Sequence, residues 1–400
     1  MEVLNFSSKR GQNEIYSDFA EREKIQGLKN LNVPNLRFPE FKGVWKDSNI
    51  GRCFDLYSGN TPSRMEKEHF IGDVNWITSG ELKEHYIGDT KERISEKAAA
   101  DNNLRILPIG TFVMAIYGLE AEGVRGTCSI TVKTSTISQA CMAFTPKSNV
   151  SNEFLYSWYK KHGNKIGIRY AQGTKQQNLS YDIIEKFPII YPSIEEQEKL
   201  NTFISLLDER IATQNKIIQQ LQSLIKGIVV SVIAETPNTR IDKCLACHSS
   251  TLQENQIEAI GNSPVYGANG ICGYTDNADF NEPAILIVKD GSGVGNVRYV
   301  SGQYSAIGTQ NILTSQNEYC LKYIYFCLQA FNFVPYKTGM AIPHIYFKDY
   351  GKAKIYCPKY EKQIEITKQI ENIEKKIEIE TTLLNKYEEQ KKFLLSNMFI

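Results

Sequence analysis

A motif of two cysteines and a histidine lies at Cys244, Cys247 and His248. The spacing Cys-x-x-Cys-His is typical of covalent haem attachment, and thiolate and imidazole groups are also ligands that zinc prefers. Haem attachment needs an exported protein, however, and residues 1–10 lack the apolar core of a signal peptide. A structural zinc site would need a second pair of ligands. We therefore interpret these residues as ordinary packed or surface cysteines.

A glycine-rich stretch at residues 290–297, DGSGVGNV, is similar to a loop that cradles phosphate. Phosphate loops carry a lysine and open into a helix whose first N–H groups face the anion. This stretch has no lysine, and strand-like segments lie on both sides of it. We favour a β-turn or bulge that needs positive φ at its glycines.

Catalytic motifs are absent from the sequence. It contains no Asn/Asp-Pro-Pro-aromatic tetrapeptide of an amino-methyltransferase, no Gly-x-x-x-x-Gly-Lys-Ser/Thr nucleotide loop and no His-Glu-x-x-His zinc motif. We therefore predict that the chain is not an enzyme by itself and that any chemistry belongs to partners.

Two long stretches each carry an apolar seam in which the spacing alternates between four and three residues. Such a seam forms one stripe on a helix and needs a partner helix to cover it. The second seam repeats the first at a constant offset of 166, which also relates Gly173 to Gly339 and Gln197 to Gln363. The chain is therefore a tandem duplication of domain and long helix. The predicted seam residues are Leu200, Ile204, Leu207, Ile211, Gln214, Ile218, Leu221 and Ile225 in the first helix and Ile366, Ile370, Ile373, Ile377, Glu380 and Leu384 in the second.

The simplest arrangement relates the two repeats by a pseudo-twofold axis across the long helices. We therefore expect an antiparallel coiled coil with one domain at each end. Gln214 and Glu380, which are polar, would then approach each other near the axis. A polar pair in a seam costs stability and can fix register. The alternative is that both are incidental positions that tolerate polarity, and the sequence leaves the two readings open.

The composition is that of an ordinary globular protein. Its 400 residues suit two domains and a helical rod, and 42% of them are hydrophobic. Lysine and arginine number 46 against 45 acidic residues, so the net charge of +1 lacks the basic excess of non-specific nucleic-acid binders. Nine scattered cysteines and the lack of a membrane-length apolar run predict a cytoplasmic protein.

Proline breaks and helix signals divide the chain into five segments of an α+β protein. In the first domain we expect strands at 110–117, 129–133 and 140–145 and a helix at 152–162. Ser193 and Glu196 form a predicted capping box at the start of the central helix. The segments are an N-terminal arm and extended lead-in (1–45), a first domain (46–193), a central long helix (194–235), a second domain (236–357) and a C-terminal long helix (358–400).

Several tracts together resemble the specificity subunit of a type I restriction-modification system. They are the lead-in NVPNLRFPEFKGVW, the tracts SGNTPSR and VNWITSGEL, the loop GTKQQNLS, and in the second half VYGANGICGYT and DGSGVG. The resemblance covers nearly everything from residue 33 to 400 and includes the duplicated layout. It implies two target-recognition domains that each read one half of a bipartite DNA sequence, separated by an antiparallel helical pair.

The resemblance also implies partners and a role in host defence through DNA methylation. Two methyltransferase subunits would dock on the helices, and translocase-nuclease subunits would join them. S-adenosylmethionine, ATP and magnesium would be bound by these partners, and this chain would bind no cofactor and no metal. The competing interpretation, from another class, is a non-catalytic coiled-coil scaffold whose two domains bind protein.

Reading of bases requires side chains with paired donors and acceptors on protruding loops. For each residue of this kind a solvated or structural role remains the alternative. The candidates are Arg64, Lys67, Ser79, Arg125, Lys175, Gln176 and Gln177 in the first domain and Tyr266, Asn269, Arg298, Lys337 and His344 in the second.

Overall fold

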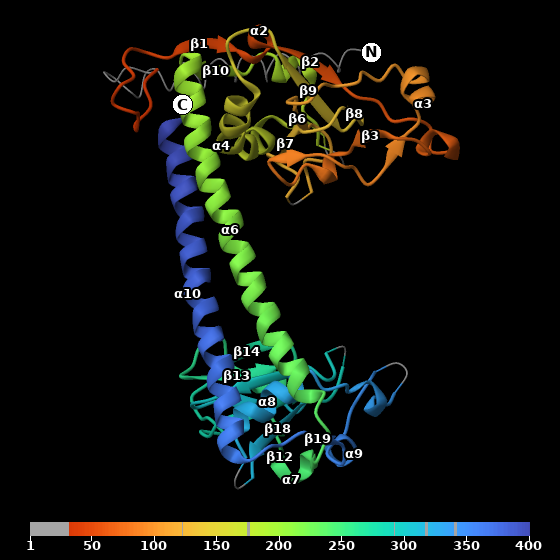
Figure 1. The fold of residues 1–400 in the computed structure, drawn as a ribbon, viewed down its shortest axis with the longest axis vertical. Coiled ribbons are helices and arrows are strands. Elements are labelled where there is room, and N and C mark those ends of the chain that lie inside the picture. Colours follow the sequence, from red (N-terminus) through yellow and green to blue (C-terminus); the bar gives the residue numbers. More distant parts are fainter. Residues whose placement is uncertain (1–31, 122, 174–176, 292, 317–318, 340–341) are drawn as a thin grey trace. The chain divides into compact units, whose positions relative to one another are not determined.

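The computed structural model describes residues 32–121, 123–173, 177–291, 293–316, 319–339 and 342–400. The chain divides into two units (Figure 1). Unit 1 comprises Met1–Ala212 and Asn385–Ile400, and unit 2 comprises Thr213–Leu384. The long helices α6 (Ile194–Ile233) and α10 (Tyr360–Met398) each contribute to both units. Within the described ranges, no helix has the length and apolar character needed to cross a bilayer.

Unit 1 is built on a five-stranded sheet in the order β2-β9-β6-β7-β4. Helix α4 (Asn152–Tyr170) packs against three of its strands, β6, β7 and β9. The five strands are Phe54–Ser58, Cys141–Pro146, Phe112–Ala115, Cys128–Thr131 and Tyr86–Ile87 in that order. Smaller sheets are β5-β3-β8 (Arg93–Ile94, Val74–Ile77, Ser135–Ile137) and β1-β10 (Lys46–Asn49, Pro188–Tyr191). Short helices are α2 (Ile50–Cys53), η1 (Lys67–Phe70), η2 (Ser79–Glu81), α3 (Glu96–Asp101) and α5 (Tyr181–Ile184).

Unit 2 is built on a four-stranded sheet in the order β12-β18-β15-β16. Helix α8 (Leu321–Gln329) packs against β15 and β16. The four strands are Leu245–Ser249, Gln310–Ser315, Ala284–Val288 and Val297–Val300. Smaller sheets are β14-β13-β17 (Gly270–Thr275, Ser263–Gly267, Ser305–Ala306) and β11-β19 (Thr239–Arg240, Lys354–Ile355). Short helices are α7 (Ile241–Cys244), η3 (Glu254–Gln256), η4 (Val334–Tyr336) and α9 (Phe347–Tyr350).

The two units repeat one topology. Strands β2, β9, β6 and β7 correspond to β12, β18, β15 and β16, and the parallel pair β3–β8 corresponds to β13–β17. Strand β4 is the addition, because it extends the sheet of unit 1 beyond β7, whereas β16 ends the sheet of unit 2. The predicted fold class, two mixed α/β domains in tandem duplication with two long antiparallel helices, is confirmed.

The strand predicted at 110–117 contains β6, and those predicted at 129–133 and 140–145 overlap β7 and β9, each of which extends one residue beyond the predicted bounds. The predicted helix at 152–162 is too short. Helix α4 continues to Tyr170 through Gly163 and Gly167. A Cβ at Gly163 would lie 2.8 Å from the Cα of Gly126, and a Cβ at Gly167 would lie 3.1 Å from the Cγ of Arg125. These glycines therefore permit close approach of a neighbouring loop and do not end the helix.

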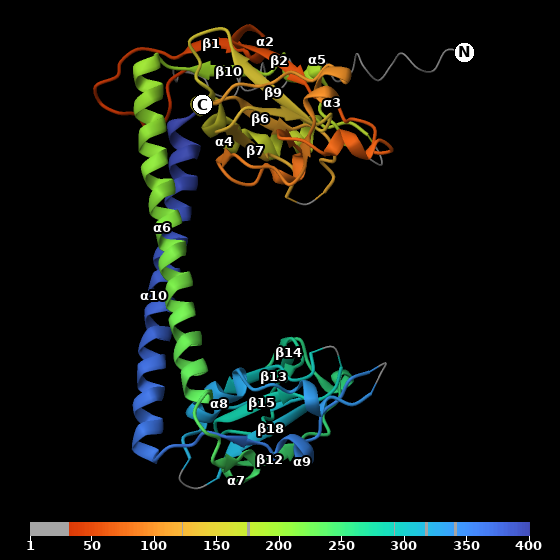
Figure 2. The same ribbon diagram turned by 45° about the vertical axis from the view of Figure 1, so that its right-hand side comes forward.

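The long helices pair within each unit. In unit 1, Leu200 and Ile204 of α6 share a core with Leu394 and Met398 of α10. In unit 2, Val229 of α6 shares a core with the first turns of α10. The N-terminal part of α6 thus contacts the C-terminal part of α10, and the C-terminal part of α6 contacts the N-terminal part of α10. The helices are therefore antiparallel (Figures 1 and 2). All fourteen seam residues named from the sequence are buried or half-buried.

Gln214 and Glu380 meet in the seam of unit 2. The Gln214 amide Nε2 donates to the Glu380 backbone carbonyl at 3.1 Å and also to the Glu380 carboxylate. Lys376, one turn earlier on α10, pairs with the same carboxylate. The polar pair is therefore a specific contact, and only matched register along both helices allows it.

An equivalent glutamine joins each domain to its long helix. In unit 1 the Oε1 of Gln197 accepts from the backbone N–H of Ser151, the N-cap of α4, at 2.9 Å. In unit 2 the Oε1 of Gln363 accepts from the backbone N–H of Cys320, the N-cap of α8, also at 2.9 Å. Both glutamines are buried, and each also donates to the carbonyl of the proline that precedes its helix. The duplication therefore preserves the attachment between domain and helix.

The lead-in packs on the start of α6 through a buried ion pair. The guanidinium of Arg37 donates from Nε and Nη2 to the two carboxylate oxygens of Glu196, each at 2.7 Å. The Trp45 indole N–H donates to the same carboxylate at 3.3 Å. Glu196 is only 2% exposed. The predicted capping box is therefore half right, because the Ser193 hydroxyl accepts from the Glu196 N–H while the carboxylate contacts the lead-in.

Substituting Glu196 by alanine should destabilise unit 1 by about 3 kcal/mol, because a buried guanidinium loses its carboxylate. The amide of Leu36, which donates to the carbonyl of Asn397 at 2.9 Å, should lose its protection from hydrogen exchange. Thermal melting and hydrogen exchange measure both effects. Glu198→Ala, on an exposed neighbour, is the control, and equal effects of the two substitutions would contradict the role of the ion pair.

The stability of the helix pair should depend on pH through Glu380. Hydrogen bonds from Lys376 and then Gln214 lower the pKa of this carboxyl below its ordinary value of 4.5. The stabilisation is present above about pH 4.5 and is lost as the pH falls through the lowered pKa. The difference in melting temperature between the native protein and Glu380→Gln should therefore shrink with falling pH. Glu378→Gln, at an exposed position of the same helix, should show no such trend, and parallel curves for Glu380→Gln would refute the prediction.

Candidate nucleic-acid interface

Arg125 and Gln177 come together in unit 1. The Nη2 of Arg125 donates to the side-chain Oε1 of Gln177 at 3.1 Å. The Gln177 backbone carbonyl accepts from the N–H of Leu119 at 3.0 Å, and its own N–H donates to Glu120 Oε2 at 2.7 Å. The described parts of two loops, 117–121 with 123–127 and 172–173 with 177–178, thus form one surface. Lys175 and Gln176, also predicted from the sequence, lie outside the described residues.

Electrostatics and packing hold Arg125 in place. Its aliphatic stem lies against Gly167 of α4, and its buried Nε has no hydrogen-bond partner. The backbone N–H of Gln177 lowers the pKa of Glu120, and the charge of Arg125 lowers it further. A carboxylate therefore accompanies the guanidinium, and any anion that binds here must compete with it.

The other candidates of unit 1 lie elsewhere. Arg64 forms a two-pronged ion pair with Glu92, and its guanidinium lies 4.4 Å from the ring centre of Phe70. Lys67 is exposed on η1, and Ser79 is half-buried at the start of η2. Among the described residues, no hydrogen bond or ion pair joins any of these three to Arg125 or Gln177, whereas Arg125 and Gln177 contact each other.

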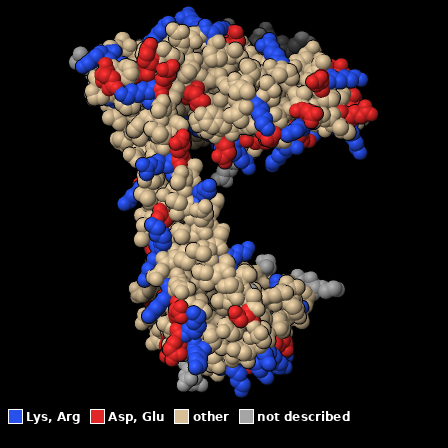
Figure 3. Space-filling model, viewed as in Figure 1, with Lys and Arg blue, Asp and Glu red and all other residues tan. Residues whose placement is uncertain are grey.

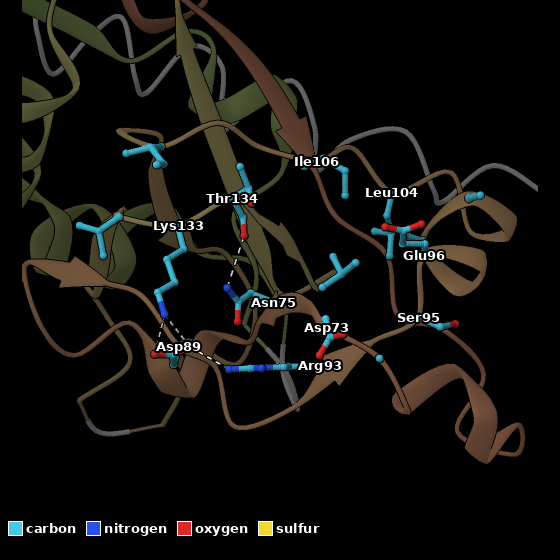
Figure 4. A pocket seen from close by; sticks show the side chains of 16 residues that line it. Asp73, Asn75, Asp89, Arg93, Ser95, Glu96, Leu104, Ile106, Lys133 and Thr134 are labelled. Atoms are coloured by element: carbon cyan, nitrogen blue, oxygen red, sulfur yellow. Dashed lines mark hydrogen bonds and ion pairs between the residues drawn. The ribbon is translucent and has the colours of Figure 1, made fainter.

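A cavity of about 1000 Å³ in unit 1 was not expected from the sequence. Figure 4 shows Asp89 between Lys133 and Arg93, which donate to it at 2.9 and 2.8 Å. The hydrogen bond from Lys133 is the main cause of a lowered pKa at Asp89. The Asn75 amide donates to the Thr134 carbonyl at 3.4 Å. Asp89 is thus paired with two cations, and one of these, Lys133, lies too far away in sequence for the pairing to be recognised there.

In unit 2 the candidates cluster around a hairpin turn. The guanidinium of Arg298 lies 5.8 Å from the ring centre of Tyr266, and Asn269 is exposed at the turn between β13 and β14. A Cβ at Gly270, in the same turn, would lie 3.5 Å from an Arg298 nitrogen. Tyr266, Asn269 and Arg298 therefore belong to one surface.

The glycine-rich stretch and the 337–344 loop adjoin that surface. Gly291 and Gly295 have a φ of +93° in the hairpin loop between β15 and β16, so the predicted turn is confirmed. A Cβ on Gly293 would lie 3.9 Å from the Cβ of Ala268. The N–H of Gly291 donates to the Pro343 carbonyl at 3.0 Å, which is the counterpart of the bond from Leu119 to Gln177 in unit 1.

Lys337 and His344 flank this second loop. Lys337 is exposed, and the ring of His344 lies edge-on to Tyr346 with centres 5.1 Å apart. The backbone of His344 pairs with that of Asp290 and of Thr338. The loops at 172–178 and 337–344 are thus attached in equivalent ways, although their side chains differ.

The cysteine motif forms no site of its own. Cys244 is buried in α7 with its Sγ 3.8 Å from that of Cys357, whereas His248 is exposed and lies 3.0 Å from the hydroxyl of Thr314. The described residues include no group of three or more histidine, cysteine or acidic side chains that could hold a metal. Cys244 and His248 therefore point to different surroundings.

Charge is mixed over the visible surface of unit 1. Figure 3 shows lysine and arginine side chains interspersed with aspartate and glutamate on the face drawn. This pattern agrees with the net charge of +1. The described residues on this face do not gather into a single basic patch.

Similarity to known proteins agrees with the duplicated layout. A family model for the "Type I restriction modification DNA specificity domain" matches residues 43–223 and 247–389. Over 192 residues the chain is 30% identical to the type I restriction enzyme MjaIX specificity subunit of Methanocaldococcus jannaschii, a match that spans 46% of this chain and 43% of that relative. Over 356 residues it is 21% identical to the EcoprrI specificity subunit of Escherichia coli, which covers 79% of this chain and 84% of the relative.

Solved structures share the fold. The S subunit of a type I restriction-modification system from M. genitalium superposes with a TM-score of 0.59 at 17% identity, over 92% of this chain and 99% of that one. A chain from a study of complex assembly and conformational transition of the type I R-M system gives a TM-score of 0.59 at 12% identity, over 89% and 97% of the two chains. Because the family model matches most of the chain in both halves, the chain belongs to the family of type I restriction-modification specificity subunits.

Proposed function

We propose that this chain is a non-catalytic reader of DNA sequence in which each unit recognises one half of a bipartite target. The observation that supports this is the combination of one topology with two different sets of loop residues. Arg125 and Gln177 would belong to the interface of unit 1, whereas Tyr266, Asn269 and Arg298 would belong to that of unit 2, and contacts within each set support this. Two readers of different half-sites need a common attachment and different contacts.

We further propose that the long helices set the spacer and dock two methyltransferase subunits, to which translocase-nuclease subunits add. Pairing of the two helices covers only one apolar stripe on each helix. Apolar side chains outside that stripe remain exposed, such as Leu206 and Leu224 on α6 and Phe393 on α10, and they support a docking role. The complex would act on DNA in the cytoplasm.

The cofactors would belong to the partners. The chain lacks the catalytic tetrapeptide and the nucleotide loop, so S-adenosylmethionine, ATP and magnesium have no recognisable site in it. Calorimetry of the isolated chain with S-adenosylmethionine should therefore show no binding, and tight binding would refute this division of labour.

The scaffold alternative, in which both domains bind protein, has less support. The family that the chain belongs to is described by DNA specificity, and the match includes both domains. A scaffold also has less reason to vary the loops while preserving Gln197 and Gln363. Mapping of methylated adenines in cells that carry the assembled complex tests the two directly, because only a DNA reader yields a bipartite sequence.

Inserting four residues after Gln219 should widen the spacer of the methylated sequence by one or two base pairs without altering either half-site. The seam from Leu200 to Val232 is about 50 Å long at roughly 1.5 Å per residue, which corresponds to about 15 base pairs. Four residues add about 6 Å and nearly restore the seam, at some cost in stability. The measurement is the methylation map of the native and lengthened complexes. An unchanged spacer in an active lengthened complex would show that the helices are not the ruler.

A further inference from the structure

Strand β16 of unit 2 and strand β7 of unit 1 occupy the same place but have different surroundings. Strands β15 and β6 are equivalent in the two units. Arg298 is the partner of Leu286 on β15, and Ser129 is the partner of Val113 on β6, so Arg298 and Ser129 occupy corresponding positions. Strand β4 covers β7, and Ser129 is fully buried with its hydroxyl donating to the Glu84 carbonyl at 2.7 Å. Strand β16 is the edge of its sheet, and Arg298 on it is half-buried, so part of its side chain remains accessible.

The Arg298 guanidinium contacts an aromatic ring and has no acceptor among the residues that the structure describes. Its guanidinium lies over the Tyr266 ring, which holds a planar cation by cation–π attraction. Gly270, which has a φ of +127°, lies in the turn beside the guanidinium, and a Cβ at this position would be 3.5 Å from an Arg298 nitrogen. Within the described part of the chain, no group accepts a hydrogen bond from Arg298 or forms an ion pair with it.

The other two half-buried arginines among the described residues, Arg37 and Arg125, donate to Glu196 and Gln177. A guanidinium that is partly withdrawn from water and has no acceptor is costly unless a ligand supplies one. Arg298 therefore differs from Arg37 and Arg125 in lacking an acceptor, and it differs from the exposed Arg105, which also lies over a tyrosine ring, in being half-buried.

The neighbouring segments place Arg298 within the candidate interface. The turn that contains Asn269 lies beside Arg298, and Gly293 approaches that turn at Ala268. The loop that ends at His344 is joined to the same hairpin through Asp290. Polar loops therefore surround the free guanidinium, as expected for a group that meets a base edge and not an isolated surface charge.

We propose that Arg298 determines specificity by reading a guanine in the half-site bound by unit 2. Its two terminal N–H groups would donate to the guanine O6 and N7, the pair of acceptors that matches the guanidinium fork. Tyr266 acts as a positioning residue that keeps the fork in plane. This inference rests on the proposed function, because it presumes that unit 2 binds DNA.

The test compares methylated-adenine maps of assembled complexes that carry native chain, Arg298→Ala or Arg298→Lys. Arg298→Ala should make one guanine position degenerate, with discrimination there reduced roughly 10- to 100-fold. Arg298→Lys should relax the same position, because lysine keeps the charge but loses the fork. The other half of the target should not change. Tyr266→Leu should relax that position to a smaller extent and no other.

Arg240→Lys is the matched control, since it alters an ion-paired arginine of the same unit and should leave the sequence intact. A full guanine preference in an active Arg298→Ala or Arg298→Lys complex would overturn the inference. So would a uniform loss of activity that lysine restores, because this indicates a phosphate contact. If Arg298→Ala does not fold, as judged by thermal melting, Arg298→Lys decides alone. Failure of the proposed function would give a different result from failure of this inference, because the methylation map of the native complex would then contain no bipartite sequence.

Discussion

The need to cover the apolar seams of α6 and α10 determines most of this structure. Neither helix can leave its seam in water, and each end of each seam is buried in the core of a domain as well as against the other helix. Leu200 and Ile204 belong to the main core of unit 1, and Ile366 and Ile370 belong to that of unit 2. The long helices are therefore parts of the domain cores and not appendages, which fixes how each domain is attached to them.

The duplication preserves attachment and varies the surface. Gln197 and Gln363 make the same bond to the first turn of a domain helix, and the β1–β10 and β11–β19 pairs close both domains next to the long helices. The differences lie between β3 and β6 and between β13 and β15, where unit 1 adds β4, β5 and α3. Changes in these segments leave the helix attachment untouched, so the loops can vary without loss of the frame.

Periodic features were predictable from the sequence, and isolated pairings were not. The seam, the offset between repeats and the strands β6, β7 and β9 have regular patterns that one sequence reveals. Strands of two residues such as β5 and β17 have no period, and Gly163 in α4 reads as a breaker until its close neighbour is known. The pairing of Arg64 with Glu92, and the contrast between Arg298 and Ser129, depend on register between distant segments, which composition does not encode.

The sheet edge at β16 also bears on solubility. An edge strand presents unpaired N–H and C=O groups that can template pairing with another chain, and a charged side chain on it opposes that association. In unit 1 the added strand β4 protects the corresponding strand β7, whereas unit 2 has the cation of Arg298 at that place. The two halves of one duplication thus guard the same sheet edge against aggregation by different means, a strand in one and a charge in the other.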